Sequence, residues 1–127
     1  MTLTALNPTS VPASPFYSNG IEVRSADRLV YVSGQVGMTA DGTILEGIEA
    51  QAVQAVANLN AVLGEAQFTA ADLVKITIYL TDPADVEPFM RATGASLPDL
   101  PPTTTMLIVA GLASPALRVE IEAVAAR

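Results

Sequence analysis

Residues 72–85 read DLVKITIYLTDPAD, and this stretch decides the fold class. Along residues 74–80 apolar side chains alternate with more polar ones, as they do in a β-strand whose two faces have different surroundings. Asp82-Pro83 followed by Asp85 then supplies an N-cap, a first-turn proline and a first-turn acid, which together are typical of a helix start. A strand that leads directly into a helix predicts a β–α unit.

A second pattern, over residues 46–66, predicts a long helix before that strand. Gln51 and Asn58 belong to its polar side, which we expect to face solvent. Its apolar side is expected to cover one face of a sheet. The apolar residues recur at spacings of three and four and are Ile48, Ala52, Ala55, Leu59, Val62 and Ala66, with Val56 and Leu63 widening the stripe.

The other predicted strands are short and are separated by turn residues. Residues 25–27 have turn chemistry, so the strands on either side of them are expected to pair as a hairpin, and residues 40–43 are expected to close another one. The order is then ββ(β)αβαββ, an α+β fold with both helices on one face of a mixed sheet, in a single domain of residues 1–127. The predicted strands span residues 2–6, 20–24, 28–33, 74–80, 103–110 and 117–124.

The composition favours self-association and argues against nucleic-acid binding. Hydrophobic residues make up 50% of the chain and charged residues only 15%, against about 25% in an average domain. A second copy of the chain is a simple way to cover the remaining apolar surface, although abundant alanine also raises the apolar count. The net charge of −7 repels phosphate backbones, so we expect no nucleic-acid partner.

The chain contains neither histidine nor cysteine, so the commonest general base, thiol nucleophiles and the commonest metal ligands are missing. We expect no metal and no cofactor, and any chemistry must come from carboxylates, hydroxyls, arginines, backbone amides or water. Residues 1–15 lack the basic start and apolar centre of a signal peptide, and no apolar run has the length of a membrane span. A cytoplasmic protein without membrane contact is the expectation.

The last predicted strand carries three charged residues on one face. Three charged side chains in a row cannot share a dry core. The pattern alone favours a solvated face on an edge strand, and the alternative is that one carboxylate lines a cleft. The charged residues Arg118, Glu120 and Glu122 alternate with Leu117, Val119 and Ile121.

Three other candidates each allow a functional and a structural interpretation, and the residues alone favour the structural one. Tyr17, in a loop, either covers a pocket or is a partly buried anchor. Ser33-Gly34, at a strand end, either presents backbone amides to a ligand or forms a tight bend. Residues 103–105 are three threonines, whose hydroxyls suit an anion but which are also common in strands.

Six stretches in a fixed order carry a further signal. They are PFYS (15–18), LVYVSGQ (29–35), EAQA (49–52), ANL (57–59), DLVKITIYLTD (72–82) and VEIEAVA (119–125). Their order and spacing together resemble the Rid family, also called the YjgF or reactive-intermediate-deaminase family, over nearly the whole chain. The resemblance implies a chorismate-mutase-like α+β fold and a homotrimer, whose sheets form a barrel-like core with a small-molecule cleft at each subunit boundary. It also implies hydrolysis of an enamine or imine to a carbonyl compound and ammonia, without metal or cofactor.

The resemblance gives four residues a role. Tyr17 corresponds to the family's cleft tyrosine. Ser33 and Gly34 correspond to the strand end that borders the ligand. Glu120 corresponds to the carboxylate that positions the attacking water, and is the expected catalytic residue.

One position departs from the family pattern. The deaminases carry an arginine after a Pro-x pair on the penultimate strand, where it grips the substrate carboxylate. Thr104 occupies that position beside Thr105, and Met106 stands where many members have cysteine. A neutral hydroxyl cannot replace a guanidinium as a carboxylate anchor. Arg118 on the next strand either compensates or, as we expect, pairs with Glu122.

Three functions stay open on this basis. The first is a Rid-type trimer that hydrolyses a neutral or differently charged molecule through Glu120, and the second is a non-catalytic small-molecule-binding or regulatory protein on the same scaffold. A ribonuclease, an activity that has been attached to relatives, is opposed by the acidic charge and the missing histidines.

Overall fold

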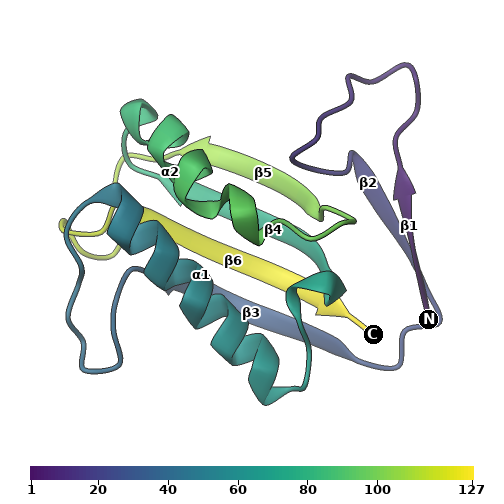
Figure 1. The fold of residues 1–127 in the computed structure, drawn as a ribbon, viewed down its shortest axis with the longest axis horizontal. Helices are drawn as coiled ribbons and strands as arrows, with labels where there is room; N and C mark the ends of the chain where they lie inside the picture. Colours follow the sequence, from purple (N-terminus) through teal and green to yellow (C-terminus); the bar gives the residue numbers. More distant parts are fainter.

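The computed structural model describes residues 1–127 as a four-stranded sheet with two helices on one face, and a separate two-stranded sheet to one side (Figure 1). Short 3-10 helices lie at Ala70–Asp72, Pro83–Asp85 and Gly94–Ser96. The main elements are β1 (Thr2–Leu6), β2 (Gly20–Arg24), β3 (Leu29–Val36), α1 (Ile48–Glu65), β4 (Leu73–Leu80), α2 (Val86–Thr93), β5 (Thr103–Ile108) and β6 (Val119–Ala126).

The four-stranded sheet has the order β3-β6-β4-β5, in which β4 and β5 are parallel and β6 is antiparallel to both of its neighbours. The helix α2 makes the crossover that a parallel pair requires. Figure 1 shows α1 and α2 packed on the same side of this sheet. The other side, which carries Tyr31, Thr77, Tyr79, Glu120 and Glu122, has no helix on it, and we call it the open face. The α+β class and the two helices on one face are thereby confirmed.

A side-chain hydrogen bond and a glycine turn set where the two helices begin. The Asp82 carboxylate accepts a hydrogen bond from the backbone N–H of Ala84 over 2.9 Å, directly ahead of α2. Gly47, with φ of 87°, turns the chain into α1 in a conformation that favours glycine. Neither helix combines the length and the hydropathy that crossing a bilayer would require.

The predicted hairpin of residues 20–33 is wrong. β2 pairs with β1, whereas β3 pairs with β6. Ser25, in the left-handed region at φ 56°, turns the chain away from β2. The backbone N–H groups of Asp27 and Arg28 both donate to the carbonyl of Arg127, so β3 begins alongside the C-terminal end of the chain.

The two polar residues expected on the solvent side of α1 are buried or half-buried instead. Gln51 is only 1% exposed and donates to the carbonyls of Leu45 and Ala116, while Asn58 donates to the carbonyls of Val36 and Met38. Each amide thus ties α1 to backbone carbonyls of neighbouring segments. On the apolar side, Leu63 is fully buried as expected, whereas Val62 is exposed.

Candidate functional site

Glu120 lies on the open face of the sheet, opposite Tyr79 of β4. Its carboxylate reaches over β3, where a Cβ atom on Gly34 would collide with it. The pairing of β3 with β6 shifts register between Val32 and Gln35, so the carboxylate sits at an irregularity in the ladder. A side chain at position 34 would therefore require the Glu120 carboxylate to move from its present place.

A second carboxylate on the open face is already engaged. The Tyr79 hydroxyl donates to Oε1 of Glu122 over 2.6 Å. This hydrogen bond, together with desolvation and the negative charges of Glu122 and Glu120, raises the pKa of Tyr79 above its ordinary value. Glu120 itself forms no ion pair and no side-chain hydrogen bond. It is thus the open-face carboxylate that is free to hold a water or a ligand.

A cavity of about 340 Å³ lies on the open face, and Glu122, but not Glu120, is among the residues that line it. Ser33 lines it together with Lys75 and Thr77, and Thr105 lies on the same face opposite Thr77. The open face therefore brings four of the sequence-predicted residues to one side of the sheet, namely Ser33, Gly34, Thr105 and Glu120.

A second cavity, of about 360 Å³, lies between the opposite face of the sheet and the helices α1 and α2, and we call it the helix-side cavity. Tyr17 reaches it from the N-terminal loop, and Thr104 and Met106 reach it from β5. The Thr104 hydroxyl donates to the Pro102 carbonyl over 3.1 Å. None of the lining residues is charged, and most are aliphatic or aromatic.

Strand parity separates the two groups of predicted residues. Thr104 and Thr105 are neighbours on β5, and their partners on β4 are Ile76 and Thr77. Adjacent residues of a strand point to opposite faces, so Thr104 faces the helices and Thr105 faces away from them. Glu120 shares the open face with Thr105. One chain by itself therefore does not bring Glu120 next to Thr104.

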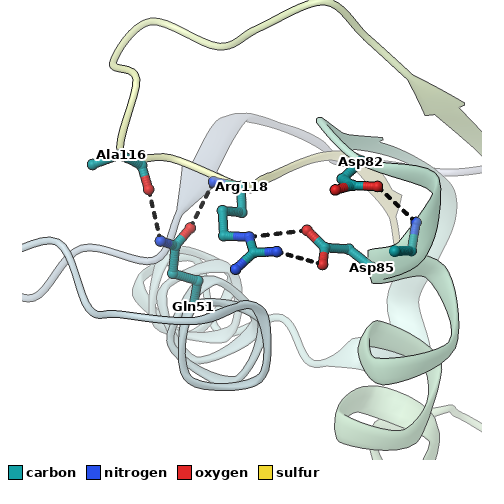
Figure 2. Close-up of polar contacts among 6 residues, drawn as sticks. Gln51, Asp82, Asp85, Ala116 and Arg118 are labelled. Atoms are coloured by element: carbon teal, nitrogen blue, oxygen red, sulfur yellow. Dashed lines mark hydrogen bonds and ion pairs between the residues drawn. The ribbon is translucent and has the colours of Figure 1, made fainter.

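Arg118 lies immediately ahead of β6, where both its side chain and its backbone are hydrogen-bonded (Figure 2). Its guanidinium makes a two-pronged ion pair with Asp85, with Nε and Nη2 at 3.0 and 2.7 Å from the carboxylate oxygens. Its backbone N–H donates to the Gln51 side chain over 2.8 Å. The expected pairing with Glu122 is therefore wrong, because the buried Asp85 carboxylate at the start of α2 claims the guanidinium instead.

The sequence pattern missed two residues that the structure places beside the predicted ones. From the sequence, Tyr79 and Lys75 are predicted only to lie on the more polar side of a strand. Their alternation with apolar residues was the available signal, because it puts both on the same face as Thr77. No three His, Cys, Asp or Glu side chains lie close enough together to hold a metal ion.

Comparison with known proteins gives the same family by sequence and by fold. The family model described as Endoribonuclease L-PSP matches residues 8–127. A RutC family protein of Aquifex aeolicus is 38% identical over 73 residues, which is 57% of this chain and 55% of that protein, so the match spans about half of the relative. The mitochondrial protein mmf1 of Schizosaccharomyces pombe is 30% identical over 127 residues, which is 98% of this chain and 76% of that protein. Since one relative is mitochondrial, the cytoplasmic location stays a prediction.

The crystal structure of YyfB from Yersinia pestis, a Rid protein of unknown function, superposes with a TM-score of 0.82 at 30% identity, covering 100% of both chains. The fold is thus that of the YjgF or chorismate-mutase-like proteins. The chain belongs to the Rid/YjgF family, the family whose model is described as Endoribonuclease L-PSP.

Proposed function

We propose that the protein is a Rid-type hydrolase of an enamine, an imine or a related metabolite, that it works as a homotrimer, and that Glu120 is its catalytic residue. One observation carries the proposal. The Glu120 carboxylate lies against Gly34 on the open face with no cation or hydroxyl bonded to it, whereas the neighbouring Glu122 is occupied by Tyr79.

A free carboxylate beside a reacting carbon acts as a general base. Glu120 accepts a proton from a water molecule while the water oxygen bonds to the imine carbon, and the C=N double bond becomes a C–N single bond. Glu120 passes this proton to nitrogen, which gives a neutral carbinolamine. It then takes the remaining proton from the new hydroxyl group and delivers it to nitrogen, so that the C–N bond breaks, ammonia leaves and the C=O bond forms. The sum is one imine and one water giving one carbonyl compound and one ammonia, so no cofactor is needed.

The proposed site takes residues from two subunits. Glu120 and Thr104 lie on opposite faces of one sheet, so a ligand held by the Thr104 side of one chain can meet only the Glu120 of another. Apolar side chains left exposed on the open face support such an assembly, since Tyr31 is 75% exposed and Leu29 and Leu107 are also exposed.

The proposed substrate lacks the carboxylate that the family's arginine would bind. Thr104 stands at the arginine position, and the cavity around it contains no cation. Arg118 is not offered as a substitute, because Asp85 holds its guanidinium through Nε and Nη2 and Arg118 does not line the cavity. The same uncharged cavity favours the second candidate function, which is a small-molecule-binding protein without catalysis.

The test compares two substrates in one assay. 2-Aminoacrylate and a related enamine without a carboxylate are generated in situ, and the release of the carbonyl product is followed. We expect acceleration for the uncharged enamine only, its loss in Glu120→Gln, and its retention in Glu65→Gln, a matched change at an exposed position on α1. If neither substrate is hydrolysed faster than in buffer, the protein is the non-catalytic binder.

A further inference from the structure

The helix-side cavity has the size and lining of a small-molecule site. Its volume of about 360 Å³ falls within the range of roughly 300–1,000 Å³ typical of ligand pockets. Phe89, which is almost fully buried, and Phe16 and Tyr17 supply aromatic surface, and Met90 and Met106 supply flexible thioethers that fit irregular apolar shapes. A ligand that enters the cavity would move from water into mostly apolar surroundings.

Few polar groups face this space, and they have unused hydrogen-bonding capacity. Tyr17 and the exposed Asn60 are among the lining residues, and neither side chain hydrogen-bonds to another group of the chain. The Thr104 hydroxyl donates to Pro102, which leaves its oxygen able to accept. A ligand with one or two neutral hydrogen-bonding groups would therefore be oriented, while the rest of it packs on apolar atoms.

A charged ligand would be at a disadvantage in the same place. An ion that leaves water needs a counter-charge or several hydrogen bonds, and the lining supplies no ionised side chain. The guanidinium of Arg118, just ahead of β6, is bound to Asp85 and is not part of the lining. The chemistry of the cavity therefore selects against carboxylates and ammonium ions.

We propose that the helix-side cavity binds an uncharged, largely apolar ring compound that carries one neutral hydrogen-bonding group. The inference names the substrate class of the proposed function, and it rests on that function only for the claim that the bound molecule reacts. Binding itself stands on the cavity alone.

The four methionines of the chain provide an internal control for a binding experiment. Met90 and Met106 line the cavity, whereas Met1 and Met38 do not. The full-length protein with ¹³C-labelled methionine methyl groups is titrated with indole, a neutral ring with one N–H donor, and with indole-3-carboxylate. We expect indole to shift the Met90 and Met106 methyl signals and leave the other two in place, and indole-3-carboxylate to shift none of the four.

Two valines on one helix give a matched pair of variants. Val56 lines the cavity, and Val53, one turn earlier on α1, is exposed outside it. Val56→Phe is expected to fill the cavity and weaken indole binding by about tenfold or more, whereas Val53→Phe keeps the wild-type affinity. Equal weakening in both variants would place indole somewhere other than the cavity and overturn the proposal.

The binding inference and the proposed hydrolysis fail in different ways. If Met90 and Met106 do not shift in the wild-type protein, or shift equally with indole-3-carboxylate, the inference is wrong even if Glu120-dependent hydrolysis is found. If indole shifts both methyl groups in wild type and equally in Glu120→Gln, yet no enamine is hydrolysed, the inference holds and the proposed function does not.

Discussion

The two faces of the four-stranded sheet carry different chemistry although they belong to the same strands. On the side of α1 and α2, Leu80, Val119 and Ile121 form part of the buried core, and the cavity that remains there has no charged lining. On the open face, Glu120 and Lys75 stand among exposed or half-buried residues. Alternation along each strand is sufficient to build both surfaces. The comparison teaches that one face suits apolar recognition and the other suits proton transfer.

The largest expected effect is on the free energy of unfolding, where truncation of a buried leucine is compared with truncation of an exposed one. Leu80→Ala on the helix side should lower the free energy of unfolding by about 2–5 kcal/mol, because it leaves a cavity in the core. Leu107→Ala on the open face should cost about 0.5 kcal/mol or less in chain stability but weaken association between chains. Urea unfolding and light scattering at two protein concentrations measure both. The distinction between the faces would be contradicted if Leu107→Ala lowered the free energy of unfolding as much as Leu80→Ala does at every protein concentration.

The next prediction places an arginine on each face in turn. Thr104→Arg should gain hydrolysis of 2-aminoacrylate by on the order of a hundredfold, because a bidentate charge-assisted pair contributes about 1.5–3 kcal/mol per hydrogen bond. Thr105→Arg, one residue along and on the other face, should gain nothing. The assay is the rate of ketoacid release. A gain only in Thr105→Arg would show that the carboxylate position of the family lies on the open face.

A third prediction concerns the assembly. Light scattering should give a mass of roughly three times 13.1 kDa for the wild-type protein. Tyr31→Asp places a charge on the open face and should reduce the mass toward that of one chain, while Val53→Asp on the outer side of α1 should not. A wild-type monomer at micromolar concentration would remove the shared site from the proposal.

The smallest effect is a shift in an alkaline titration. Tyr79 donates to Glu122, so its pKa is raised in the folded protein and the bond stabilises the fold below the pKa of an unfolded tyrosine. That stability is lost as the pH rises through the raised pKa. Glu122→Gln should move the Tyr79 titration, followed by absorbance near 295 nm, to lower pH. An unchanged titration would mean that the two side chains do not interact in solution.

Local patterns were sufficient to predict α1, β4 and α2, because helix period, strand alternation and an N-cap depend on residues close in sequence. The pairing of β2 and β3 with other strands was not predictable in this way, since it depends on the distant ends of the chain. The inward positions of Gln51 and Asn58 depend on loop carbonyls that a helical pattern does not contain.

The candidate site shows the same limit. The resemblance proposed Glu120 and Thr104 for one cleft, and it could not show that strand parity puts them on opposite faces. Arg118 was expected to bond to a near neighbour, yet its partner Asp85 is 33 positions away in the chain. A short-range pattern contains no information on which of several acidic residues reaches a given guanidinium.

The fixation of Arg118 has a consequence for protein engineering. Its side chain is held by Asp85, its N–H by Gln51, and its carbonyl accepts from Thr81, so the first residue ahead of β6 is fastened at three points. The preceding loop, residues 109–117, therefore ends at a residue that is bonded at three points, which should limit how far its movements extend into β6. Lengthening this loop by a few residues, or grafting a tag into it, should leave Glu120 in place, which makes it the segment of choice for immobilising or labelling the protein.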